Sequence, residues 1–184
     1  MNDKQIYTAI RSTLLMGFQA LGLSNVSVIR AYQPTFQGRN DDMTIYMTKI
    51  FDKRIGHPER TDIYQAENDD FLHTEKVLYE STFQLMAMVE ENPHNLDGLT
   101  PQDLANMAAH IMQSDAGITY LRKCGLMPLR VTDIRNPYFK NDKGQFEASP
   151  SFDIILTHSQ SVTSVIPAAQ NITPTLLGKF DHGN

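Results

Sequence analysis

One long segment near the middle of the chain limits the possible folds more than any other. In KVLYESTFQLMAMVEENP, which runs from Lys76 to Pro93, apolar and polar side chains alternate. With a period of two, polar Glu80, Thr82, Gln84 and Glu90 share one face. The other face carries Val77, Tyr79, Phe83, Leu85, Ala87 and Val89, with Ser81 as its lone polar member. A helical period would mix Glu80 and Gln84 into the apolar stripe, so the pattern predicts a strand.

The length of this strand is unusual. From Lys76 to Glu90 it would span about 45–50 Å at about 3.3 Å per residue, whereas most strands have roughly 3–10 residues. The strand is therefore expected either to bend at a bulge or to project past its domain. A projecting strand leaves backbone groups unpaired, and a neighbouring subunit can pair them. This is the first indication of an oligomer.

Three helices are predicted from apolar spacing and capping residues. The first runs from Asp3 to Leu21, with Asn2 or Asp3 as its cap and Gly22 at its end. The second begins at Thr100-Pro101-Gln102-Asp103, where Thr caps, Pro takes the first position and the acid meets the helix dipole. Its expected buried stripe is Leu104, Met107, Ala108, Ile111 and Met112. A short third helix is expected over residues 116–123, capped by Asp115 and ended by Gly125.

The remaining strands complete the predicted fold. Two strands are expected over Asn25–Tyr32 and residues 43–53, and a long loop is expected to follow from Arg54 to Asp70. Two later strands, LMPLRVTDIRN and SPSFDIILTHSQ, are expected to form a hairpin. The order predicts an α+β domain: an antiparallel or mixed sheet of about five strands, with the N-terminal helix and a helix pair on one face. Residues 1–160 are expected to form this domain, and residues 161–184 an extended C-terminal tail.

Composition narrows the classes of function. The formal net charge is -5 and the pI about 5.6, so the chain lacks the clustered Lys and Arg that bind nucleic acid stably. Cys124 is the only cysteine, which excludes an internal disulfide and the usual zinc patterns. The first residues, MNDKQIYTAIRSTLLMGF, are interrupted by Lys4 and Arg11, so neither a signal peptide nor a membrane span is expected there.

No motif in the sequence predicts catalysis. The 6 histidines lack metal-ligand spacing, and His73 and Glu75 are expected to share one strand face in an ordinary hydrogen bond. Cys124 has no nucleophile motif around it and is expected to be a packed thiol, and Gly178-Lys179 lacks the upstream glycine of a phosphate loop. The protein is therefore predicted not to be an enzyme and to hold no metal and no cofactor.

Two irregular segments are the candidate interaction surfaces. Loops of about twenty residues are usually functional or disordered, and the one beginning at Arg54 offers Arg54, His57 and Arg60 to a neighbouring subunit. The tail offers scattered apolar side chains that could dock on another chain: Ile172, Leu176, Leu177 and Phe180.

Taken together, these segments resemble the neck and tail terminator proteins of tailed bacteriophages. The resemblance is carried by ALGLSNVSVIRAYQPTF, MTIYMTKIFDKRIG, TEKVLYESTFQLMAMVE, TPQDLANMAAHIMQSDAGITYLRKCGL and LRVTDIRNPYFKNDKGQFEASPSFDIILTHSQ. It rests on the order and texture of these segments and extends to about Ser161, without the tail.

The resemblance implies a structural role in the virion. Such proteins form rings, typically of six subunits, that cap the tail tube and join it to the head–tail connector while DNA passes through the centre. The implied partners are other copies of this chain, the tail tube protein and the connector or adaptor protein, with no specific DNA binding and no membrane. The implied location is the neck of the virion, and the host cytoplasm during assembly. An acidic subunit suits a conduit whose wall must not trap phosphates.

Three alternatives stay open at this stage. Within the neck, a head-completion or stopper protein is the nearest. A small-molecule-binding α+β regulator would have its pocket between sheet and helices. An enzyme with an unrecognised site would need convergent titratable groups, which the sequence does not reveal.

Overall fold

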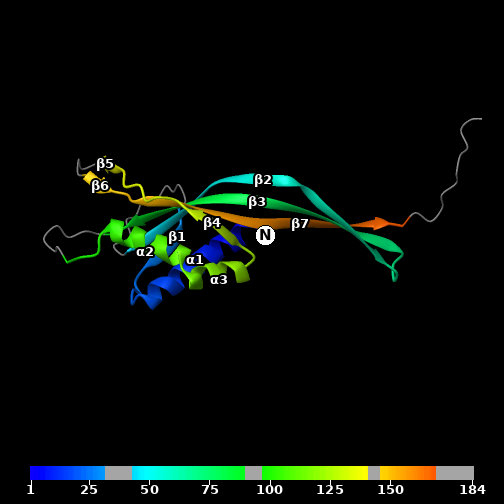
Figure 1. Cartoon of the computed structure of the whole chain (residues 1–184), viewed down its shortest axis with the longest axis horizontal. Helices are drawn as coiled ribbons and strands as arrows, with labels where there is room; N and C mark the ends of the chain where they lie inside the picture. The colour runs from blue at the N-terminus through cyan, green and yellow to red at the C-terminus, as the bar shows by residue number, and fades with distance from the viewer. Residues whose placement is uncertain (32–42, 90–96, 141–145, 169–184) are drawn as a thin grey trace, which may run out of the picture. The chain divides into compact units, whose positions relative to one another are not determined.

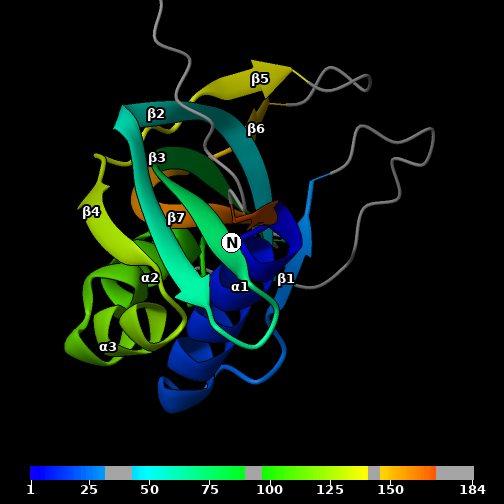
Figure 2. The ribbon, with the colours of Figure 1, turned by 90° about the vertical axis from the view of Figure 1, so that its right-hand side faces the viewer.

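The computed structural model describes residues 1–31, 43–89, 97–140 and 146–168 (Figure 1). The elements are α1 (Asp3–Ala20), β1 (Ser27–Arg30), β2 (Thr44–Gln65), β3 (Asp70–Met88), α2 (Pro101–Gln113), α3 (Asp115–Lys123), β4 (Met127–Val131), β5 (Tyr138–Lys140), β6 (Phe146–Ala148) and β7 (Ser151–Pro167). The predicted α+β class is confirmed, with helices α1, α2 and α3 together on one side of the sheet (Figures 1 and 2).

Local signals position α1 as predicted. Asn2 is its N-cap, and a capping box with Gln5 pairs backbone N–H groups that the first helical turn leaves free. The stripe Ile6, Ile10, Leu14 and Phe18 is fully buried. Leu21 was expected on the same stripe, but it lies at the C-cap and is 52% exposed.

The predicted start of α2 is also confirmed. Thr100 and Asp103 form a capping box around Pro101. The stripe through Leu104, Ala108, Ile111 and Met112 is buried, and Met107 is partly buried against the same core. Gly17 of α1 is required here, because a Cβ at this position would overlap the side chain of Ile111. In α3 the cap is Ser114, one residue before the expected Asp115.

The main sheet has the strand order β1-β2-β3-β7-β4. Strand β1 is parallel to β2, and β4 is antiparallel to β7, as expected for the predicted hairpin. Strand β3 lies in the middle, so its backbone is paired on both sides and it is not the exposed strand that its length suggested. Its predicted apolar face is confirmed in the middle of the strand, where Ser81, Phe83, Leu85 and Ala87 are all buried. Val77, Tyr79 and Val89 of this face are only partly buried, and Thr82 of the predicted polar face is also buried.

The predicted loop between Arg54 and Asp70 is wrong. Strand β2 continues for 22 residues to Gln65, and β3 begins at Asp70 after a short turn. Gly56, with φ 69°, and Pro58 gave the segment its loop-like appearance. Both are tolerated here because, among the described residues, β1 pairs with β2 only over Thr44–Met47 and leaves the outer side of β2 beyond Met47 as an edge.

The chain divides into two compact units, each with its own contacts. The first comprises Met1–Pro58 and Val77–Gln160, and the second comprises Glu59–Lys76 and Ser161–Asn184. In the first unit the helices and the sheet enclose the hydrophobic core. The described residues of the second unit, 59–76 and 161–168, are segments of β2, β3 and β7 with the adjoining turn, and we call them the ribbon.

The C-terminal part of the chain differs in one respect from the expected tail. Residues 161–167 are the last part of β7 and are therefore strand. The expectation for the rest of the tail concerns residues outside the described part. Between β4 and β7, strands β5 and β6 form a separate antiparallel pair.

Candidate interaction surfaces and a buried polar cluster

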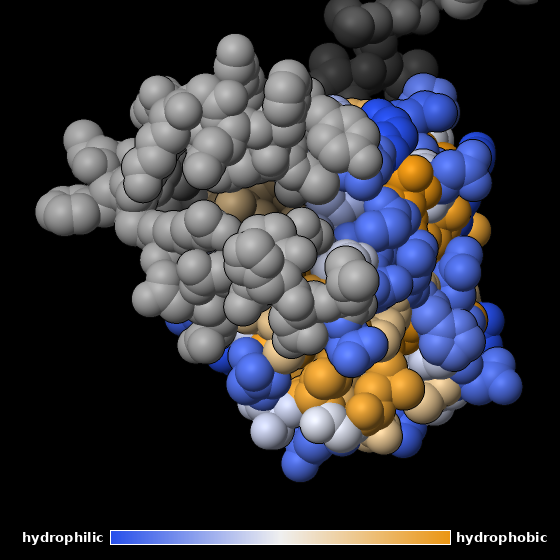
Figure 3. Space-filling view, turned by 90° about the vertical axis from the view of Figure 1, so that its left-hand side faces the viewer, coloured by the Kyte–Doolittle hydropathy of each residue, from blue (hydrophilic) through white to orange (hydrophobic). Residues whose placement is uncertain are grey.

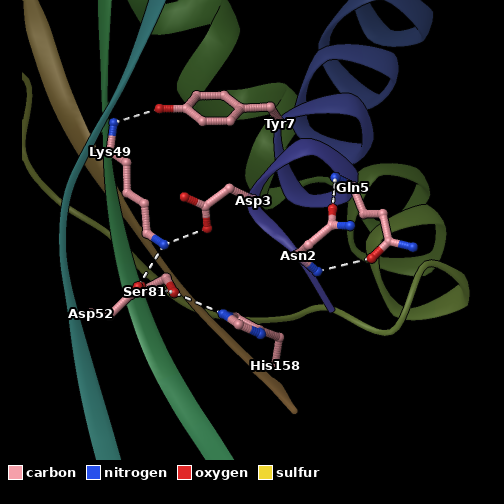
Figure 4. Close-up of polar contacts among 8 residues, drawn as sticks. All are labelled: Asn2, Asp3, Gln5, Tyr7, Lys49, Asp52, Ser81 and His158. Atoms are coloured by element: carbon pink, nitrogen blue, oxygen red, sulfur yellow. Dashed lines mark hydrogen bonds and ion pairs between the residues drawn. The ribbon is translucent and has the colours of Figure 1, made fainter. Parts of the chain in front are cut away.

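A lysine of β2 holds two carboxylates together in the first unit. The Nζ atom of Lys49 lies 2.6 Å from Oδ1 of Asp3 on α1 and 2.6 Å from Oδ2 of Asp52 on β2 (Figure 4). The backbone N–H of Lys49 donates to the hydroxyl of Tyr7, at 2.9 Å. These contacts fasten the first turns of α1 to β2.

The electrostatics of this lysine follow from its neighbours. Burial disfavours the ammonium, but hydrogen bonds and charge from Asp3 and Asp52 outweigh it and raise the pKa of Lys49 above 10.5. Burial by itself would raise the pKa of Asp52. Hydrogen bonds from Lys49 and Ser81 outweigh burial and hold this pKa below 3.8. Lys49 and Asp52 are therefore both charged at neutral pH.

The cluster continues through a serine to a buried histidine. The Ser81 hydroxyl donates to Oδ1 of Asp52 at 2.5 Å, and its Oγ lies 2.9 Å from Nε2 of His158 on β7. Because Ser81 gives its proton to Asp52, Nε2 of His158 is the donor to Ser81. Nδ1 of His158 is buried without a hydrogen-bond partner, and the ring stacks on Tyr79 at 5.6 Å. Burial lowers the pKa of His158 below 6.5, so the imidazole is neutral.

The arrangement of this cluster differs from that of an activated serine. An activated serine needs a base that takes its proton and a third group that orients the base. Here the carboxylate of Asp52 accepts the hydrogen bond of the Ser81 hydroxyl directly. Nδ1 of His158, which a third group would have to bind to orient the base, has no hydrogen-bond partner. Ser81 is fully buried and His158 is 5% exposed, which leaves a substrate no approach. In the described part of the chain, no group of three or more His, Cys, Asp or Glu side chains could hold a metal ion.

The ribbon has polar contacts of a different kind. Across β2 and β3, Nε of Arg60 lies 2.9 Å from Oε1 of Glu75, and Nδ1 of His73 lies 2.5 Å from Oδ1 of Asp62. The rings of Tyr64 and Phe71 follow with centroids 5.3 Å apart. Cross-strand pairs of this kind stabilise a sheet without burial, and none of the described ribbon residues is buried.

His73 is the centre of the ribbon's ion pairs. The hydrogen bond with Asp62 is the main cause that raises its pKa above 6.5, and Glu75, 3.6 Å from Nε2, acts in the same direction. His73 and Glu75 do lie on one face of the strand, as the sequence predicted. Lys76 also pairs with Glu59, at 3.6 Å, so the ribbon's cations are matched by carboxylates of the same chain.

The predicted contact residues occupy three different situations. Arg54 and His57 are exposed on β2 within the first unit, and Arg60 is exposed on the ribbon. Arg60 already binds Glu75, and its contact to a neighbouring subunit stays a prediction. Four further candidates lie outside the described residues: Ile172, Leu176, Leu177 and Phe180.

Exposed apolar side chains mark possible contact surfaces. In the first unit, apolar patches lie between hydrophilic side chains on the face shown in Figure 3. In the ribbon, large apolar side chains are exposed by 44–67%: Ile63, Tyr64, Val162, Val165 and Ile166. Contiguous exposed apolar surface is typical of protein–protein interfaces.

The buried cluster was not anticipated from the sequence. Only one signal pointed to it, which was Ser81 as the lone polar residue on an otherwise apolar strand face. Its partners come from α1, β2 and β7, far apart in the sequence, so no local spacing connects them.

Comparison with known proteins identifies relatives of the whole fold. The family model described as E217 gateway protein gp29 matches residues 5–168. This range includes most of α1, all of α2 and α3, and all strands of the sheet. None of the curated proteins matches the chain. No helix among the described residues is both long enough and apolar enough to cross a membrane.

Proposed function

Because the chain belongs to the E217 gateway protein gp29 family, and is thereby a structural protein of the bacteriophage neck or connector, we propose that it forms a ring that terminates the tail tube. The ring joins the tube to the head–tail connector and lets DNA pass through its centre. The family match over residues 5–168 supports the neck or connector role, and the terminating ring is our extension of it from the order of the elements and the surfaces described above.

The ribbon supports assembly of the chain with copies of itself. It consists of three adjacent strand segments without a buried residue, and sheets of this size gain little stability from their own packing. A ring in which each copy contacts two neighbours covers such surfaces on every copy. We take six as the expected number of copies.

The charge of the chain supports a conduit for DNA. With a formal net charge of -5, the surface offers phosphates little attraction, so DNA is not retained by counterion release. We also propose that the protein acts without catalysis and without a cofactor. Among the described residues, the cluster of Asp52, Ser81 and His158 is closed by its own hydrogen bonds, which supports a role without catalysis.

Mass measurement tests the proposal directly. Native mass spectrometry and light scattering of the purified full chain, at several concentrations, are expected to show a ring, either alone or after mixing with isolated tail tubes. A concentration-independent monomer that ignores both tubes and connector complexes contradicts the proposal. Binding to connectors but not to tubes favours the stopper alternative instead.

Truncation separates the tail from the sheet. A chain ending at Ala168 keeps β7 complete and removes Ile172, Leu176, Leu177 and Phe180. It is expected to fold with an unchanged melting temperature and to assemble more weakly, because apolar docking residues are lost. An unchanged ring population contradicts a docking role for these residues.

A further inference from the structure

The outer side of β7 in the ribbon is an open strand edge. Strand β4 pairs with β7 from Ile154 to Thr157, and in the described part of the chain no strand pairs with the outer side of residues 161–167. On its inner side the same segment neighbours β3, as shown by Thr74 Oγ1, which lies 3.3 Å from Thr163 Oγ1.

The hydrogen bonds at both ends of β7 show which backbone groups face β3. The carbonyl of Pro150 accepts from the N–H of Ala87 at 2.9 Å, and the N–H of Ala168 donates to the carbonyl of Asp69 at 3.2 Å. As residue numbers rise along β7 they fall along β3, so the two strands are antiparallel. Both of these β7 residues have even numbers, and alternate residues of an antiparallel strand bond to the same neighbour. Even-numbered residues of β7 therefore bond to β3.

Odd-numbered residues of β7 face the opposite side. The carbonyl of Asp153 accepts from the N–H of Thr132, and Ser151 exchanges both of its backbone bonds with Arg135. Continued along the strand, this alternation turns the N–H and C=O groups of Ser161, Thr163 and Val165 toward the open edge.

The composition of this edge is unusual for a strand that faces water. Natural edge strands are protected by charges, proline or bulges. The outer side of β2 has such protection in Lys53, Arg54, Gly56 and Pro58. Residues 161–166, SVTSVI, contain neither charge nor proline nor glycine, and Val162 is 67% exposed. A segment of this kind aggregates unless another strand covers it.

We propose that residues 161–166 of β7 pair with residues 59–65 of β2 from a second copy of this chain, as parallel strands. The proposal rests on the proposed function and gives the ring its interface. Because β2 and β7 are both antiparallel to β3, they are parallel to each other within one copy. Rotation about an axis that runs along the strands leaves the strand direction unchanged, so β7 of one copy meets β2 of the next copy as a parallel neighbour. Repeating this contact around the axis closes the ring and covers both edges of every copy.

The side chains of β2 are compatible with an uncharged neighbour. Its charged residues in the ribbon, Glu59, Arg60 and Asp62, are each paired with a residue of β3 in the same copy. An approaching β7 edge therefore leaves no new charge unpaired, which would be costly. The exposed apolar residues Ile63 on β2 and Val165 on β7 become cross-strand neighbours on the joined sheet.

A proline at an outward-facing position tests the pairing. Val165→Pro removes an N–H that faces the open edge and keeps the bonds to β3, whereas the control Val165→Thr keeps both the N–H and a β-branched side chain. By native mass spectrometry of the full chain, the assembled fraction is expected to fall by at least about tenfold for Val165→Pro and to change little for Val165→Thr. Rings of Val165→Pro as abundant as those of the wild type overturn the proposal.

Cysteine linkage keeps the test decisive if the proline variant fails to fold. In a Cys124→Ser background, Thr163→Cys combined with Thr61→Cys places thiols opposite each other in the register that pairs Ile63 with Val165. Ile63→Cys replaces Thr61→Cys to test a register shifted by two residues. Oxidised assemblies are expected to give a ladder of linked chains on a non-reducing gel, and Thr163→Cys alone is expected to give none. Dimers from Thr163→Cys alone show β7 paired with itself, and intact rings without any linkage show another interface; both results overturn the proposal. A wild-type chain that never assembles, even with tail tubes, overturns the proposed function as well.

Discussion

Two histidines show how differently the two units use the same side chain. His158 in the first unit is 5% exposed, and burial lowers its pKa below 6.5. His73 in the ribbon lies between Asp62 and Glu75, and these carboxylates raise its pKa above 6.5. The first unit thus buries its histidine and favours the neutral imidazole, whereas the ribbon leaves its histidine near solvent and favours the charged form through ion pairs. The first unit is stabilised by its core, and the ribbon by contacts across its strands.

The aromatic pairs of the two units repeat this difference. Phe83 is fully buried and meets Tyr7 edge to face, with centroids 5.2 Å apart. Tyr64 and Phe71 in the ribbon lie 5.3 Å apart but are 52% and 36% exposed. The centroid distances are therefore similar, although the interplanar angles are 87° and 54°, and the apolar area removed from water differs between the two pairs. We expect the ribbon to gain its remaining stability from a partner.

The largest effect is expected from truncating the core aromatic. Phe83→Ala should lower the free energy of unfolding by about 3–5 kcal/mol, because it leaves a cavity in a closed core. Phe71→Ala is the matched ribbon variant and should cost far less. Urea unfolding followed by circular dichroism measures both, and equal losses would mean that the ribbon is as tightly packed as the core.

A smaller loss is expected from opening the buried polar cluster. Ser81→Ala removes the group that accepts from His158 and donates to Asp52, so buried polar atoms lose their partners at a cost of about 1–3 kcal/mol. Thr74→Ala, which removes an exposed hydroxyl contact in the ribbon, is the control. If the two variants melt at the same temperature, the cluster does not stabilise the first unit.

The pH dependence of the first unit should come from His158. Its folded-state pKa lies below 6.5, so between that pKa and 6.5 the unfolded chain binds more protons than the folded one. Stability is therefore complete above pH 6.5 and decreases as pH falls below it. His158→Gln keeps an amide N–H for Ser81 and should flatten the melting temperature between pH 7 and pH 5. A wild-type curve that rises on acidification contradicts a neutral buried histidine.

The smallest effect, of opposite sign, is expected in the ribbon. Because the folded-state pKa of His73 is raised, its contribution is complete below pH 6.5 and is lost as pH rises through the folded value. Hydrogen exchange of the ribbon amides should therefore show stronger protection, after correction for intrinsic rates, at pH 6 than at pH 8. His73→Gln should remove this difference and leave the amides of the first unit unchanged. Equal protection at both pH values would show that the ion pairs do not order the ribbon.

Much of the first unit could be predicted from the sequence, because its signals are local. The capping boxes at Asn2 and Thr100 and the apolar stripe of α1 are each contained within a few helical turns. The buried face of β3 over Phe83, Leu85 and Ala87 follows from the alternation of apolar and polar residues, which is typical of a half-buried strand. These elements, in their order along the chain, were sufficient for the α+β class and for the resemblance to phage neck proteins.

The ribbon and the polar cluster depended on the tertiary structure. Residues 54–65 have the charges, Gly56 and Pro58 of a loop, and they form a strand because β3 pairs with them from the other side of a turn. In the cluster, the pairing of β2, β3 and β7 brings Asp52, Ser81 and His158 within hydrogen-bond distance, and the packing of α1 on the sheet adds Asp3. The sequence by itself thus determined which segments fold and which faces they bury, since propensity and alternation act over a few residues. Only the tertiary structure decided which distant strands pair and which edges stay open, because these depend on partners far along the chain.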